Sequence, residues 1–79
     1  MPATYKEKFM ASITGVITKL DKIALTDNSL TLKDEIRTLR WNRTFLDKLH
    51  GRDFVPESKS ELVGNVEKYM EVLAIKYKL

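Results

Sequence analysis

The sequence predicts an all-α fold, a small antiparallel three-helix bundle that self-associates, with residues 1–79 forming a single helical domain. Apolar residues repeat at spacings of three and four in three separate segments, which is the period of one face of an α-helix. Short connections join these segments, as in helix bundles. The 79 residues include no cysteine, so neither disulfides nor a zinc–thiolate site can reinforce so small a core. Self-association is the remaining common source of extra stability.

The first predicted helix covers residues 4–25. Its apolar residues follow spacings of four, three, four and three, so they form one seam: Phe9, Ile13, Val16, Leu20 and Ile23. Met10 and Ile17 widen this stripe. Gly15 and the β-branched residue after it lower the intrinsic helix propensity by up to about 1 kcal/mol, so we expect the helix to depend on packing.

The second predicted helix covers residues 31–50. Ser29 or Thr31 is expected to cap its N-terminus, because a hydroxyl oxygen can accept a hydrogen bond from a free backbone N–H group of the first turn. Gly51 is expected to end the helix in the left-handed conformation that C-terminal caps commonly use.

The third predicted helix covers residues 58–78, after a connection that contains two apolar residues, Phe54 and Val55. These two residues indicate a loop that is held against the core. Ser58 and Glu61 have the spacing of a capping box, which predicts the start of the helix. The apolar seam consists of Leu62, Val66, Tyr69 and Leu73.

The charge is mildly positive and concentrated in the middle of the chain. Fourteen basic and eleven acidic residues give a net charge of +3, and residues 31–52 alone hold six basic and three acidic residues. No apolar run reaches the roughly 18 residues needed to cross a bilayer, and no small-residue cleavage site follows the apolar run near the N-terminus. We therefore expect a soluble, cytoplasmic protein that does not associate with membranes.

The second helix carries the candidate functional residues. All four arginines, the only tryptophan and the only histidine lie between residues 37 and 52. Arginine has a planar set of donors suited to carboxylates and phosphates, and tryptophan frequently anchors interfaces. The candidates for binding a partner or an anion are Lys33, Arg37, Arg40, Arg43, Lys48 and His50. The alternative is that this basic stripe is only a solvated face.

The apolar arc of the second helix covers about 220°, whereas packing on one side of a core needs about 100°. One explanation is that both neighbouring helices contact this arc. The other is that a second subunit contacts part of it. In that case Leu32, Ile36, Leu39 and Leu46 face the bundle, and the interface residues are Trp41, Phe45 and Leu49.

Arg43 and His50 share the angular position of core-facing residues on the second helix. They either form an anion site or lie at the margin of the apolar arc with their polar ends in water. Their spacing resembles the Arg-to-His pattern of HEPN ribonucleases, which implies RNA cleavage that depends on His50. Thr44 follows the arginine, however, where that family has Asn, Asp or His, and the resemblance covers one helix only. We interpret it as a chance match.

No other pattern indicates catalysis. A single histidine without cysteine provides no transition-metal ligand set, and no glycine-rich phosphate loop is present. We therefore predict no enzyme activity, no catalytic residues, no metal and no cofactor.

The sequence favours a non-enzymatic binding protein of the regulator, adaptor or inhibitor type. We expect a homo-oligomer, a dimer or higher, which occupies a macromolecular partner, most simply a protein, through the second helix. The alternative is binding of nucleic acid or an anionic nucleotide-like ligand through the basic face of that helix.

Overall fold

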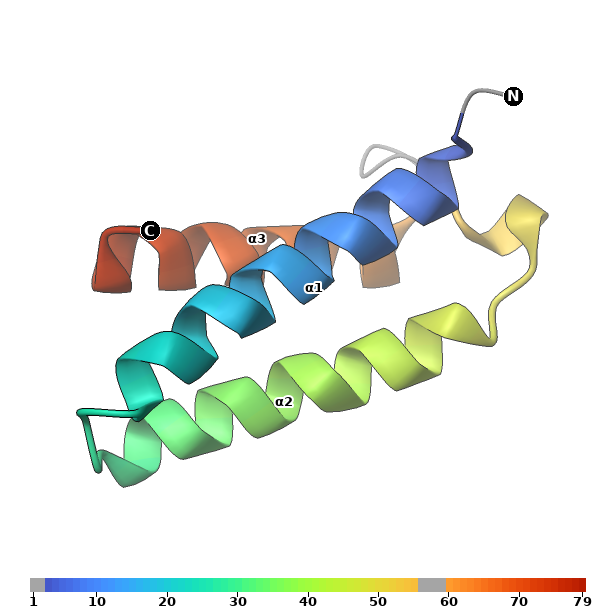
Figure 1. The fold of residues 1–79 in the computed structure, drawn as a ribbon. Helices are drawn as coiled ribbons and strands as arrows, with labels where there is room; N and C mark the ends of the chain where they lie inside the picture. Colours follow the sequence, from blue (N-terminus) through green and yellow to red (C-terminus); the bar gives the residue numbers. More distant parts are fainter. Residues whose placement is uncertain (1–2, 56–59) are drawn as a thin grey trace.

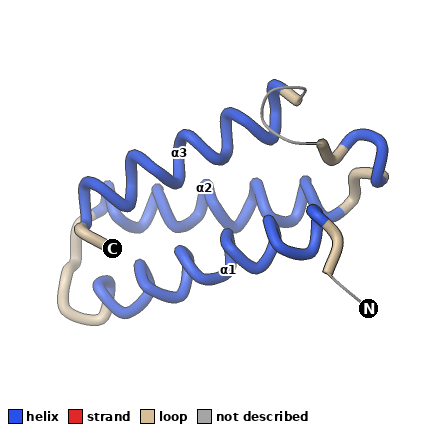
Figure 2. Tube along the Cα trace, turned by 90° about the horizontal axis from the view of Figure 1, so that it is seen from above, coloured by secondary structure: helices blue, strands red, loops and turns tan. Residues whose placement is uncertain are grey.

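The computed structural model describes residues 3–55 and 60–79, and within them three α-helices pack together (Figure 1). The elements in chain order are α1 (Tyr5–Ala24), α2 (Leu30–Asp47), the short 3-10 helix η1 (Gly51–Asp53) and α3 (Glu61–Tyr77). The described residues include no strand, so the predicted all-α class is confirmed for them. The α1–α2 connection and the C-terminal end of α3 lie at the same end of the molecule (Figures 1 and 2).

Each α-helix begins after a hydroxyl side chain that accepts a hydrogen bond from the backbone N–H group three residues later, at 3.1–3.3 Å. The three caps are Thr4 for α1, Ser29 for α2 and Ser60 for α3. Ser29, rather than Thr31, is therefore the cap of α2. The capping box predicted at Ser58 lies outside the described residues, and α3 begins three residues later than predicted.

The C-terminal end of α2 differs from the prediction. The helix ends at Asp47, three residues early, and Gly51 opens η1 instead of capping the helix with a positive φ angle. The Nζ atom of Lys6, in the first turn of α1, donates to the carbonyl oxygens of Asp47 at 2.6 Å and Leu49 at 2.9 Å. In a glycine cap, backbone N–H groups donate to the last carbonyl oxygens of the helix. Here the ammonium group of Lys6, from another helix, donates to carbonyl oxygens at this end instead.

The core lies between the three helices and the segment after α2. Its buried residues are Phe9, Ile13, Ile17 and Leu20 in α1, Leu32, Ile36, Leu39 and Leu46 in α2, Phe54, and Val63, Val66, Met70 and Leu73 in α3. The four residues of α2 are those predicted to face the bundle.

The predicted seams of α1 and α3 were correct in part, because three residues of the first and two of the second are buried: Phe9, Ile13, Leu20, Val66 and Leu73. Ile17, which was expected to widen the stripe of α1, is also buried, and Val16 is only half-buried. In α3, Val63 and Met70 are buried, whereas Leu62 is exposed. Each helix packs against two neighbours, so its buried stripe is broader than a single heptad seam and is centred elsewhere.

The segment after α2 is held against the core, as predicted. Phe54 is buried, and its ring centroid lies 5.5 Å from that of Phe9 and 6.0 Å from that of Tyr5, both in edge-to-face geometry. Edge-to-face rings attract each other because the positive edge of one ring meets the negative face of another. This aromatic cluster holds Phe54 against α1.

A polar contact joins α2 to the C-terminal end of α3. The Glu35 carboxylate accepts hydrogen bonds from the Tyr77 hydroxyl and, at 3.0 Å, from the Nζ atom of Lys76. The hydrogen bond with Glu35 raises the pKa of Tyr77 above its ordinary value, since the charged neighbour favours the protonated phenol. The same carboxylate raises the pKa of Lys76.

Candidate partner-binding face

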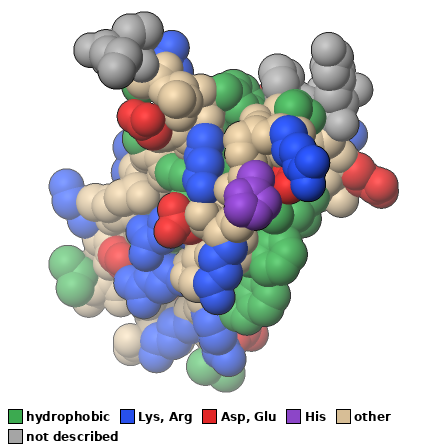
Figure 3. Space-filling view, turned by 90° about the vertical axis from the view of Figure 1, so that its right-hand side faces the viewer, with side chains coloured by type: hydrophobic (Ala, Val, Ile, Leu, Met, Phe, Trp, Pro, Cys, Tyr) green, Lys and Arg blue, Asp and Glu red, His purple; other side chains and the backbone are tan. Residues whose placement is uncertain are grey.

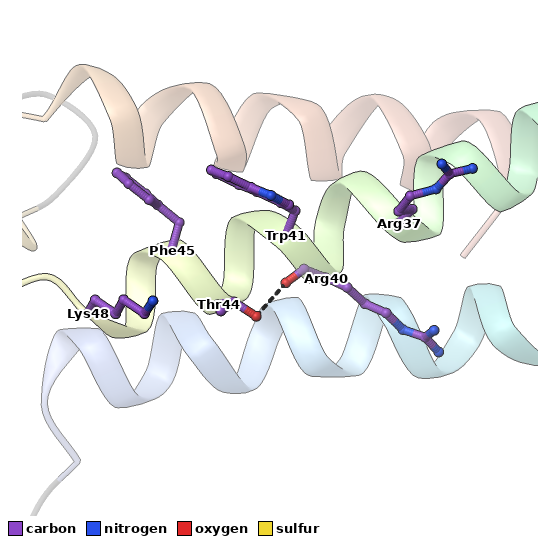
Figure 4. A pocket seen from close by; sticks show the side chains of 6 residues that line it. All are labelled: Arg37, Arg40, Trp41, Thr44, Phe45 and Lys48. Atoms are coloured by element: carbon purple, nitrogen blue, oxygen red, sulfur yellow. Dashed lines mark hydrogen bonds between the residues drawn. The ribbon is translucent and has the colours of Figure 1, made fainter.

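The outer face of α2, opposite its buried residues, carries two exposed aromatic side chains one turn apart. Trp41 is 65% exposed and Phe45 is 43% exposed. Their rings stack with centroids 5.6 Å apart and an interplanar angle of 16° (Figure 4). Large exposed rings at this position have no role in the core, so the face is a candidate site.

An open pocket of about 390 Å³ lies on this face, and its lining residues belong to α2 and its C-terminal cap, Lys48. One wall is the row Arg37, Trp41 and Phe45, and the other is the row Arg40, Thr44 and Lys48 (Figure 4). Residues four apart stand above one another on a helix, so each row is a ridge and the pocket is the groove between two ridges. We call these six residues the α2 groove.

The charge of the α2 groove is positive. Its lining includes three cations and no carboxylate. Arg37 pairs with Asp34 at 2.5 Å, and Arg40 pairs with Asp21 of α1 at 2.8 Å, in exposed ion pairs. Among the described residues, Lys48 has no ion pair. The two paired arginines are thus oriented by carboxylates outside the groove, while Lys48 remains available to a ligand.

The Thr44 hydroxyl is already engaged, because it donates to the carbonyl oxygen of Arg40 at 3.1 Å. Neither a histidine nor a carboxylate lines the α2 groove. The groove therefore offers an apolar surface beside positive charge, a combination that suits binding.

The structure places the other predicted residues outside the α2 groove. Lys33 lines a neighbouring pocket of about 350 Å³ together with Arg37 and Arg40, so it extends the basic surface. Leu49 is half-buried and packs against the core. Of the residues predicted from the sequence, the groove thus combines Arg37, Arg40, Trp41, Phe45 and Lys48.

Arg43 and His50 are not part of this groove. Arg43 is half-buried, and its Nη1 atom donates to the Thr14 hydroxyl of α1 at 3.4 Å. His50 is exposed and lies beyond the end of α2 at Asp47. Because α2 ends before His50, the helical spacing that predicted Arg43 and His50 on one face does not hold.

Figure 3 views the end of the molecule that carries the single histidine, which is His50. Lys and Arg side chains gather around the histidine, and a hydrophobic surface continues beside them. Basic and apolar surfaces are thus adjacent at this end of the bundle.

Sequence inspection missed the carboxylates that orient the arginines. Asp34 lies three residues before Arg37, which is a recognisable helical pairing distance, so this ion pair was detectable in principle. Asp21 belongs to another helix, and only the packing of α1 on α2 brings it to Arg40.

Within the described part of the chain, no helix is both long and apolar enough to span a membrane. No family model matches the sequence, and neither the curated proteins nor the solved structures that were compared include a match.

Proposed function

We propose that this protein is a non-enzymatic helical binding module, of the regulator, adaptor or inhibitor type, which occupies a protein partner with the outer face of α2. The observation that carries the proposal is the exposed Trp41–Phe45 stack, which is bordered by three cations. Tryptophan and arginine are the residues most enriched among those that dominate interface energies. Covering the two rings would remove a large apolar surface from water.

Two carboxylates favour a protein over nucleic acid as the partner. Asp34 and Asp21 already pair with Arg37 and Arg40, and they would repel a phosphate backbone that approached either guanidinium. Nucleic acid is the second candidate, because single-stranded binders also combine exposed aromatic rings with cations. Such binding should weaken steeply between about 50 and 200 mM salt.

We further propose that the helices form an antiparallel bundle that self-associates in the cytoplasm. The chain connections support the alternating helix directions, since the α1–α2 connection and the end of α3 lie at the same end of the molecule. Self-association is supported by further exposed apolar side chains, Val72 and Ile75 on α3 and Leu79 beyond its C-terminal end. Light scattering tests it: loss of oligomer mass in Ile75→Ser, but not in Trp41→Ala, would assign the interface to α3.

The function is tested by partner capture from the native host with the wild-type chain and two variants, Trp41→Ala and Phe45→Ala. We expect both variants to lose the partner while keeping their helical circular dichroism spectrum. Leu25→Ser is the matched control, because it also removes an exposed apolar side chain but lies outside α2 and α3. If both α2 variants retain partner binding and oligomer mass, the outer face of α2 is not the binding surface.

A further inference from the structure

We propose that the occupant of the α2 groove is an amphipathic α-helix of another protein, with apolar side chains flanked by acidic residues. This inference rests on the function proposed above and specifies the partner's chemistry. Its basis is the combination of groove shape, apolar wall and charge on one exposed helix face.

The shape of the groove indicates a helical occupant. Two parallel rows of residues spaced by four, on one helix, form the surface into which a ridge of a second helix packs. Both walls of the groove come from α2 and its C-terminal cap residue Lys48, so no residue of α1 or α3 lines it. A ridge of side chains spaced by three or four residues would fill it.

The walls of the groove indicate apolar anchors on that ridge. The stacked rings of Trp41 and Phe45 form one flat apolar wall. The aliphatic stems of Arg40 and Lys48 belong to the opposite row and can cover apolar surface while their charged ends stay in water. A leucine, isoleucine or methionine of the partner would contact rings on one side and stems on the other.

The charges indicate acidic residues beside those anchors. Arg40 and Lys48 are two helical turns apart on the same row, about 12 Å along the axis at 1.5 Å per residue. Asp21 already pairs with Arg40, so a carboxylate on that flank of the partner helix would face Lys48. Lys48 has no ion pair among the described residues, so a partner carboxylate there would add a contact without displacing one.

Charge also argues against a second copy of this chain as the occupant. Two α2 faces packed together would bring like-charged rows into contact, which costs free energy in a desolvated interface. The exposed apolar surface of α3 is no better, because residues 67–79 carry three lysines and two glutamates. An acidic helix from another protein complements the positive charge of the groove, whereas α2 and α3 of a second copy do not.

A display library tests the inference directly. The peptides share an amphipathic helical frame with leucines at positions i, i+3, i+4 and i+7, and each flanking position carries Glu, Gln or Lys at equal frequency. After selection on the wild-type protein, we expect Glu to be enriched over Lys on one flank. Affinities of labelled peptides are then measured by fluorescence anisotropy, so that Trp41 can be substituted without loss of the signal.

Two variants locate the bound peptide. Trp41→Ala should weaken the selected peptides by about 30-fold or more, the effect expected for a central interface residue. Lys48→Glu should weaken them by about tenfold, and replacing the facing Glu of the peptide with Lys should restore binding. Lys19→Glu is the matched control, since it changes the net charge equally on an exposed position of α1 and should leave affinity within about twofold.

The outcomes separate the two proposals. Selected peptides that need Trp41 but show no preference for Glu would refute the acidic occupant and leave the proposed function intact. Peptides that bind Trp41→Ala as tightly as wild type would refute both. If no peptide is enriched while a single-stranded RNA probe binds, or if Trp41→Ala abolishes a homodimer, the occupant is RNA or a second copy and the inference is wrong.

Discussion

The two faces of α2 are both apolar, yet only one contributes to the core. The inner face consists of buried aliphatic side chains, and Leu39 on this face is 0% exposed. The outer face presents Trp41 and Phe45, which stack on each other and are both exposed, Trp41 the more so. The comparison shows that fold and binding use different sides of one helix, so a substitution can be chosen to affect one without the other.

The two faces differ because their side chains have different neighbours. The inner side chains contact α1 and α3, so folding removes their apolar surface from water and this burial stabilises the fold. The outer rings contact each other, a pairing worth about 0.5–1.5 kcal/mol. Much of the surface of Trp41 and a smaller part of that of Phe45 are thus left for a partner to bury.

Leu39→Ala should have the largest effect, because it creates a cavity in the inner face. We expect a loss of about 2–5 kcal/mol in the free energy of unfolding, which is most of the 3–5 kcal/mol available to so small a core. Urea unfolding followed by circular dichroism measures this loss. Leu39→Met keeps the volume and should cost less than about 1.5 kcal/mol. Equal stability of the Ala variant and wild type would contradict the observed core.

Lys6→Met should have an intermediate effect, because it removes the donor that pairs with the carbonyl oxygens of Asp47 and Leu49. We expect a loss of about 1 kcal/mol, or a decrease of 4–8 °C in melting temperature for a domain of this size. Calorimetry measures the shift. Lys8→Met, which alters an exposed lysine of the same helix turn, should leave the melting temperature nearly unchanged.

Alkaline pH should weaken the contact between α2 and α3. The pKa of Tyr77 is raised in the folded state by its hydrogen bond with Glu35, so this contact stabilises the fold fully below the unfolded pKa of about 10 and is lost as pH rises through the folded pKa. Melting temperatures between about pH 8 and 11 should fall less steeply in Tyr77→Phe than in wild type. If melting temperature falls with pH at the same slope in both proteins, deprotonation of Tyr77 does not weaken this contact.

Trp41→Ala should have the smallest effect on stability, within about 0.5 kcal/mol, because the higher helix propensity of alanine offsets the lost stacking of an exposed ring on Phe45. Urea unfolding of this variant should therefore overlay that of wild type, even though partner binding is lost. A loss of more than about 2 kcal/mol would mean that the outer face belongs to the core, as the inner face does.

Local patterns predicted much of the fold and part of the candidate site. The buried residues of α2 and the buried position of Phe54 follow from spacing and residue type. The same reasoning narrowed the cap of α2 to Ser29 or Thr31, and the structure shows Ser29. The Arg37, Trp41 and Phe45 row was also recognisable, since residues four apart share a helix face. The sequence did not determine which side of each apolar stripe of α1 and α3 is buried, because neighbouring apolar residues such as Val16 and Ile17 fit a stripe equally well.

Only the tertiary structure decided which side of α2 remains free and where that helix ends. The apolar residues of α2 cover an arc of about 220°, which fits either burial by two neighbouring helices or an exposed aromatic face. The arc does not show where the other two helices lie around α2. The contacts of Lys6 with Asp47 and Leu49 span 41 and 43 residues of sequence. The sequence determined the helices through interactions three and four residues apart, whereas their packing depends on contacts between distant residues that no local period encodes.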